Sequence, residues 1–109
     1  MANIYRNAKV DLTTTDNTTV YTSPSNSRAI VKSILVSDDS GSGDSINVTL
    51  TDASSAIFSL FKTKTIGSNA TTELITQPII LQESEILKAQ ATTAGRLHMV
   101  VSLLEINRD

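Results

Sequence analysis

His98 is the only histidine in the chain, and so the only histidine that could act as a general base. It lies between Leu97 and Met99 in a stretch where apolar and polar residues alternate. A catalytic histidine works with a positioned nucleophile and usually an orienting carboxylate. The sequence near His98 contains neither a Ser-based nucleophile elbow nor a nearby acidic partner. We therefore expect a structural or surface role for His98, with a hydrolase centre as the less favoured hypothesis.

Acidic residues gather at two places that could bind an ion. Asp38, Asp39 and Asp44 flank a Ser-Gly-Ser-Gly segment, but the spacing is not that of an EF-hand loop. The segment also lacks the Lys-Ser/Thr ending of a phosphate-binding loop. Glu83 and Glu85 stand in a polar stretch that is typical of a solvated turn. The sequence thus predicts no catalytic residue, no metal site and no cofactor.

Length and composition exclude further classes of function. The 109 residues suit one domain spanning 1–109, and the absence of cysteine excludes disulfides and thiolate metal sites. A net charge of −2 and only four aromatic residues give no basis for binding nucleic acid or an anionic membrane. The apolar runs are too short for a signal peptide or a transmembrane helix. We expect a soluble protein made in the cytoplasm of its host.

Apolar and polar residues alternate with a period of two along most of the chain. Charged residues make up 18%, against an average of about 25%, whereas Ser and Thr supply 29 residues. This composition and periodicity favour strands. The expected strands lie at about 8–12, 18–23, 28–37, 46–51, 55–62, 71–76, 79–81, 85–92 and 96–106. The predicted fold class is all-β: a single-domain antiparallel β-sandwich, jelly-roll-like, with about eight or nine strands.

Two of these segments carry unusual patterns. Residues 28–37 are apolar on both faces, which predicts a strand that is central or covered on both sides. Phe58 and Phe61 are spaced as in a helical turn, but the surrounding Ser and Thr favour a strand.

The low charge of the predicted strand faces has two explanations, which the sequence does not separate. It is either a plain Thr-rich β surface or a surface that other subunits cover, because neutral faces associate without desolvating ions. For the second case we predict that residues 1–7 form an extended interface arm. The predicted assembly residues are Ile4, Tyr5, Arg6, Phe58, Phe61 and Arg108.

Part of the sequence resembles small virion structural proteins of tailed bacteriophages, of the marine and cyanobacterial phage type. The resemblance rests on residues 1–8, on 11–16 and on a Tyr-Thr-x-Pro turn that leads into an apolar strand, VYTSPSNSRAIVKSI at 20–34. It is looser over 81–88. Ser23 replaces a common Val, and Ser25-Asn26 replaces a common Ala-Gly turn. The resemblance implies a β-sandwich that assembles in many copies on a phage particle, and it implies no catalytic residues.

The sequence therefore leads to a non-enzymatic virion protein as the first functional hypothesis. We expect a capsid decoration (cement) protein that associates with itself, with a trimer as one arrangement, and docks on the major capsid protein. The alternative is a neck, tail or baseplate component. A receptor-binding or glycan-binding module at a fibre tip is a further alternative, disfavoured because the chain has no Trp and only two Tyr.

Overall fold

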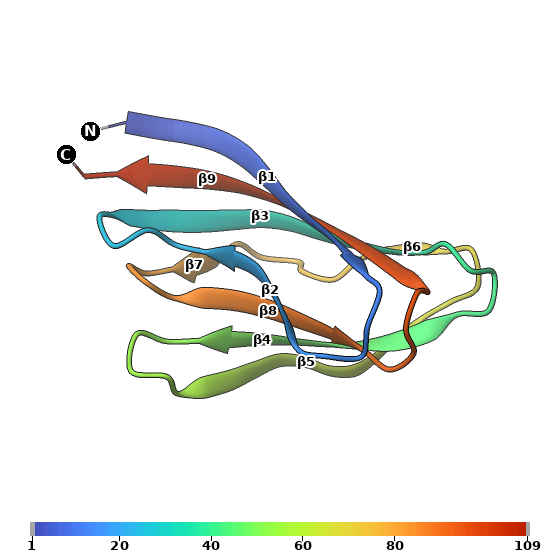
Figure 1. Ribbon diagram of the computed structural model, residues 1–109. Helices are drawn as coiled ribbons and strands as arrows, with labels where there is room; N and C mark the ends of the chain where they lie inside the picture. The colour runs from blue at the N-terminus through green and yellow to red at the C-terminus, as the bar shows by residue number, and fades with distance from the viewer. Residues whose placement is uncertain (1, 109) are drawn as a thin grey trace.

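The computed structural model describes residues 2–108 and contains nine strands and no helix among them (Figure 1). The strands are β1 (Ala2–Leu12), β2 (Thr18–Thr22), β3 (Ser27–Asp38), β4 (Asp44–Thr51), β5 (Ile57–Ile66), β6 (Thr71–Glu73), β7 (Ile79–Leu81), β8 (Ile86–Ala91) and β9 (Leu97–Asn107). The described residues therefore contain no helix that could cross a membrane.

The strands form two antiparallel sheets that face each other. The first sheet has the order β1-β9-β3, and both β6 and β7 pair with the remaining edge of β3. The second sheet has the order β2-β8-β4-β5. The predicted all-β architecture of two antiparallel sheets is thus confirmed. The chain passes from one sheet to the other between most consecutive strands.

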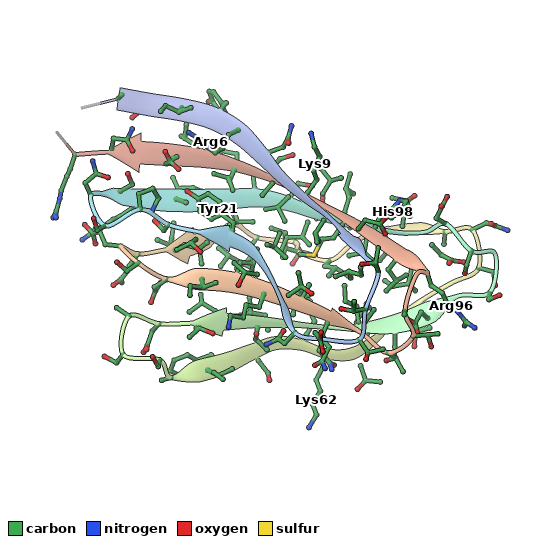
Figure 2. All side chains as sticks on the ribbon, in the orientation of Figure 1. Arg6, Lys9, Tyr21, Lys62, Arg96 and His98 are labelled. Atoms are coloured by element: carbon green, nitrogen blue, oxygen red, sulfur yellow. The ribbon has the colours of Figure 1, made fainter. Side chains whose placement is uncertain are left out.

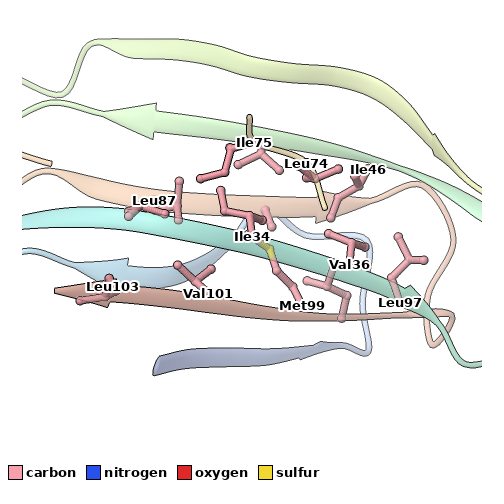
Figure 3. Packing of buried hydrophobic residues seen from close by; sticks show 14 of the residues in the cluster. Ile34, Val36, Ile46, Leu74, Ile75, Leu87, Leu97, Met99, Val101 and Leu103 are labelled. Carbon is pink, nitrogen blue, oxygen red and sulfur yellow. The ribbon is translucent and has the colours of Figure 1, made fainter. Parts of the chain in front are cut away.

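The core lies between the two sheets and is made by alternate residues of each strand (Figure 3). Ile34, Val36 and Met99 of the first sheet and Ile46 and Leu87 of the second are all fully buried. Each of these strands turns every second side chain inward, as the period-two pattern of the sequence predicts. The other side chains of the first sheet form its outer face, which no strand of the described chain covers.

The first strand is longer than predicted, because it begins at Ala2 and not at about residue 8. Residues 2–7 pair with Asn107 to Ser102 of β9 without any shift in register. They extend the edge of the sheet, so the predicted arm is part of an ordered edge strand. The two ends of the described chain consequently lie side by side (Figure 1).

Strand β5 explains the helix-like spacing of its two phenylalanines. Phe61 pairs with Val48 and Phe58 with Leu50, while the register shifts between these pairs. The shift adds one residue to β5, so both rings point to the same face although they are three residues apart. The segment is a bulged strand, which confirms the strand prediction.

Candidate docking face

A row of four apolar side chains crosses the outer face of the first sheet. Tyr5 of β1 lies opposite Leu104 of β9, Leu104 lies opposite Ile30 of β3, and Ile30 lies opposite Ile80 of β7. We call these four residues the apolar row. Tyr5 is 75% exposed and Ile80 is 52% exposed. Residues directly opposite each other on one face are in contact range, so the row is continuous across the sheet.

A second, mixed row lies further along the same face. Lys9 is opposite Val100, Val100 is opposite Leu35, and Leu35 is opposite Glu73. Both apolar members of this row are more than one-third exposed. Between the two rows, the Lys32 ammonium lies 5.6 Å from the centre of the Tyr5 ring, within the range of a cation–π contact. Four of the six exposed large apolar side chains in the described chain belong to this face.

The predicted assembly residues do not form one patch. Tyr5 lies in the apolar row, whereas Ile4 is half-buried on the opposite side of β1. Phe58 is 55% exposed beside Ile57 on β5, at the edge of the second sheet, and Phe61 packs against the core. The exposed apolar surface is therefore divided between the face of one sheet and the edge of the other.

Arg6 and Arg108 form ion pairs within the chain. The Arg6 guanidinium lies 3.5 Å from the carboxylate of Glu105, which is almost fully buried between the sheets. The Tyr21 hydroxyl donates a hydrogen bond to the same carboxylate, at 2.5 Å. Burial of Tyr21 and this bond raise the pKa of its hydroxyl well above the usual range. The cluster joins β1, β2 and β9 at one end of the sandwich, so Arg6 has a structural role (Figure 2).

Arg108 belongs to a separate cluster near the described end of the chain. Its guanidinium lies 3.3 Å from the Glu83 carboxylate, which also lies 3.5 Å from Arg28. A hydrogen bond within Glu83 itself and the two arginines hold the pKa of this carboxyl below its usual value. Glu83 is thus neutralised by structural partners and is no candidate for acid–base chemistry.

Asp38, the last residue of β3, has a structural role that the acidic sequence around it did not indicate. Its carboxylate accepts hydrogen bonds from the backbone N–H groups of Ser40, Gly43 and Asn69 and from the Ser40 hydroxyl. The Ser40 hydroxyl bond and these backbone bonds keep the pKa of Asp38 far below its usual range. The carboxylate therefore fastens two loops together. No group of three or more potential metal ligands occurs within residues 2–108.

The fold places a carboxylate beside His98, although the sequence near His98 shows none. His98 Nε2 lies 3.3 Å from Asp11, and Ser37 occupies the opposing position on β3. Across β1, β9 and β3, the three side chains stand in the spatial order Asp-His-Ser, as in a hydrolase triad. Among the described residues, however, no hydrogen bond joins Ser37 to His98. The pair lies on an open, half-exposed sheet face that would not exclude water. The two side chains add polar groups to the sheet face next to the mixed row, and they lack the organisation of a nucleophilic site.

Sequence reasoning found Tyr5 but missed the other members of the apolar row. Ile30 and Ile80 were recognised only as parts of apolar strands, and their relation to Tyr5 depends on the strand order. One signal was available: residues 28–37 are apolar on both faces. That pattern predicted a strand that is either central or covered on both sides. In the structure β3 is central, and its outer face is open to solvent at Leu35.

Comparison with known proteins finds similarity at the level of the fold. No protein-family model matches the chain, and no curated protein sequence matches it. Among solved structures, the fold resembles that of a chain in the "Acidic stable capsid structure of Helicobacter pylori bacteriophage KHP30". The TM-score is 0.60 at 10% sequence identity, over 99% of this chain and 95% of that chain. The two chains therefore share a fold over nearly their whole lengths.

Proposed function

We propose that this chain is a non-enzymatic structural protein of a tailed-phage virion, and specifically a capsid decoration (cement) protein. In this role it associates with itself and docks on the major capsid protein. The observation that carries the proposal is the open outer face of the first sheet, with its continuous apolar row. The shared fold with a chain from a phage capsid structure supports the same setting.

The chemistry of this face suits docking. Exposed apolar side chains contribute to binding when a partner covers them, and a tyrosine near the centre of an interface is a common energetic anchor. The charged side chains close to the apolar row, Lys32 and Arg28, lie at its sides and not within it. Many copies on one shell would add their individual contacts through multivalency, so that each contact can be weak.

A rebinding experiment tests the docking face. Shells assembled without this chain are mixed with purified wild-type protein or with Ile80→Asp, and bound protein is measured by co-sedimentation. We expect Ile80→Asp to weaken binding by at least about tenfold, because a charge enters the covered surface at an exposed member of the apolar row. Wild-type protein should also raise the temperature at which the shells break.

Ile57→Asp is the matched control, because Ile57 is 64% exposed on the other sheet. It should bind as wild type does. If Ile57→Asp loses binding and Ile80→Asp does not, docking occurs through Ile57 and Phe58 instead. If wild-type protein neither binds the shells nor stabilises them, the decoration role is wrong.

A further inference from the structure

The long strand β1 forms an open edge of the first sheet. It pairs with β9 along all eleven residues without a register shift, and no strand of the described chain pairs with its other side. The other sheet edges are less suited to pairing. Strands β6 and β7 have three residues each, β2 has five with a bulge, and β5 is bulged twice. Such interruptions are typical protection against edge-to-edge association, and β1 lacks them.

The backbone of β1 presents hydrogen-bonding groups at this edge in a defined pattern. The Leu12 carbonyl accepts a hydrogen bond from the Gly95 N–H, on the side of β9. In an antiparallel ladder, the N–H and C=O of one residue point the same way and alternate along the strand. Even-numbered residues of β1 therefore bond to β9. The odd-numbered residues Asn3, Tyr5, Asn7 and Lys9 direct their groups to the open edge, as does Asp11, whose carbonyl also accepts a hydrogen bond from the Thr13 N–H.

We propose that β1 pairs with β1 of a second copy, antiparallel, about a two-fold axis at Asn7. This proposal rests on the self-association part of the proposed function. In this register Tyr5 lies opposite the partner's Lys9, and Asn3 lies opposite the partner's Asp11. On the inner side, Ile4 lies opposite the partner's Val10. The two first sheets then form one continuous sheet.

This register is self-complementary in charge and in apolar contact. No like charges oppose each other, and a lysine faces an aromatic ring, which is a favourable pair. Two neighbouring registers have the same backbone polarity. The one centred on Arg6 would place two arginines opposite each other, and the one centred on Ala8 would place Tyr5 opposite the partner's Asp11 instead of a lysine. Pairing at Asn7 also joins the apolar row of one copy, through Tyr5, to the mixed row of the other, through Lys9. The exposed apolar side chains then form two continuous rows across the dimer.

Charged residues often protect sheet edges, but those of β1 are compatible with this pairing. Arg6 points to the inner side and is held by Glu105 at 3.5 Å, away from the open edge. Lys9 projects from the outer face of the sandwich, where it would reach the partner's Tyr5 (Figure 2).

Single-cysteine variants test the register, because the natural chain has no cysteine. The two Asn7 Cα atoms would lie about 5.5 Å apart, within disulfide range. Asn7→Cys should therefore form a covalent dimer on mild oxidation. Asn3→Cys is the matched control on the same face, and its two copies would lie roughly 25 Å apart. It should stay uncrosslinked alone but crosslink when mixed with Asp11→Cys. Equal crosslinking of both single variants, or none with either, would overturn the proposal.

Analytical ultracentrifugation of two variants at one position gives an independent measurement. Tyr5→Lys and Tyr5→Glu both remove the ring, but only Tyr5→Lys sets two like charges opposite each other. We expect the dimer dissociation constant of Tyr5→Lys to exceed that of Tyr5→Glu by about tenfold or more. Equal dissociation constants for the two variants would reject the register, and a trimer as the wild-type species would reject two-fold pairing.

The pairing and the proposed function can fail separately. If the protein forms these dimers but does not bind shells, only the virion role is rejected. If the protein binds shells as a monomer, only the β1 pairing is rejected.

Discussion

Replacing Val48 by aspartate is expected to abolish folding. Val48 is fully buried in β4, where it lies opposite Ala89 of β8 and Phe61 of β5. An aspartate there would bury a charge without a partner, at a cost of more than about 4 kcal/mol. Domains of this size have a free energy of unfolding of about 5–15 kcal/mol. Circular dichroism and the soluble yield of the purified variant would measure the loss.

Val100→Asp is the control for this prediction. It makes the same substitution at a residue that is 39% exposed on the outer face of the first sheet. We expect its melting temperature to stay within a few degrees of the wild-type value. A Val48→Asp protein that is soluble and melts cooperatively would show that the inward register of β4 is wrong.

Asp38→Ala is expected to give the second-largest loss of stability. The substitution removes an acceptor that serves three backbone N–H groups and the Ser40 hydroxyl. The loop between β3 and β4 and the loop between β5 and β6 would lose the carboxylate that both of them bind. We expect the melting temperature to fall by about 5–10 °C at neutral pH. Asp39→Ala is the control, because Asp39 is exposed, and it should change little.

The same substitution should change how stability depends on pH. The pKa of Asp38 is lower in the folded protein than in the unfolded chain. Its contribution is therefore complete above the unfolded carboxyl pKa of about 4 and is lost as the pH falls toward the folded value. Below about pH 4, the melting temperature of wild type should fall more steeply than that of Asp38→Ala. Parallel curves would mean that Asp38 does not hold the loops.

The sequence predicted those features that depend on local alternation. Ile46 and Val48 are buried as their period-two pattern requires, and the Thr92–Gly95 segment connects β8 and β9 as expected. Residues 2–7 were not recognised as a strand, because Asn3, Arg6 and Asn7 do not give a clear alternation. They are extended because β9 provides a full-length partner for them.

The candidate site could be predicted only in part, because it depends on which strands are neighbours. Tyr5 and Ile80 are far apart in the sequence and come together only through β9 and β3. The Asp11–His98 pair arises in the same way. Asp38 was predicted to lie in a loop, but it is the last residue of β3, and its structural role needs the backbone of Asn69 in the loop between β5 and β6. Strand order and loop contacts are properties of the whole fold, which local patterns do not encode.

The most direct test of the proposed function is a cryo-electron microscopy reconstruction of the virion, at a resolution that shows individual strands. The account predicts density for this two-sheet fold on the outside of the head, with the outer face of the first sheet against capsid subunits. Density for the chain in the neck, tail or baseplate, or its absence from the particle, would contradict the decoration role.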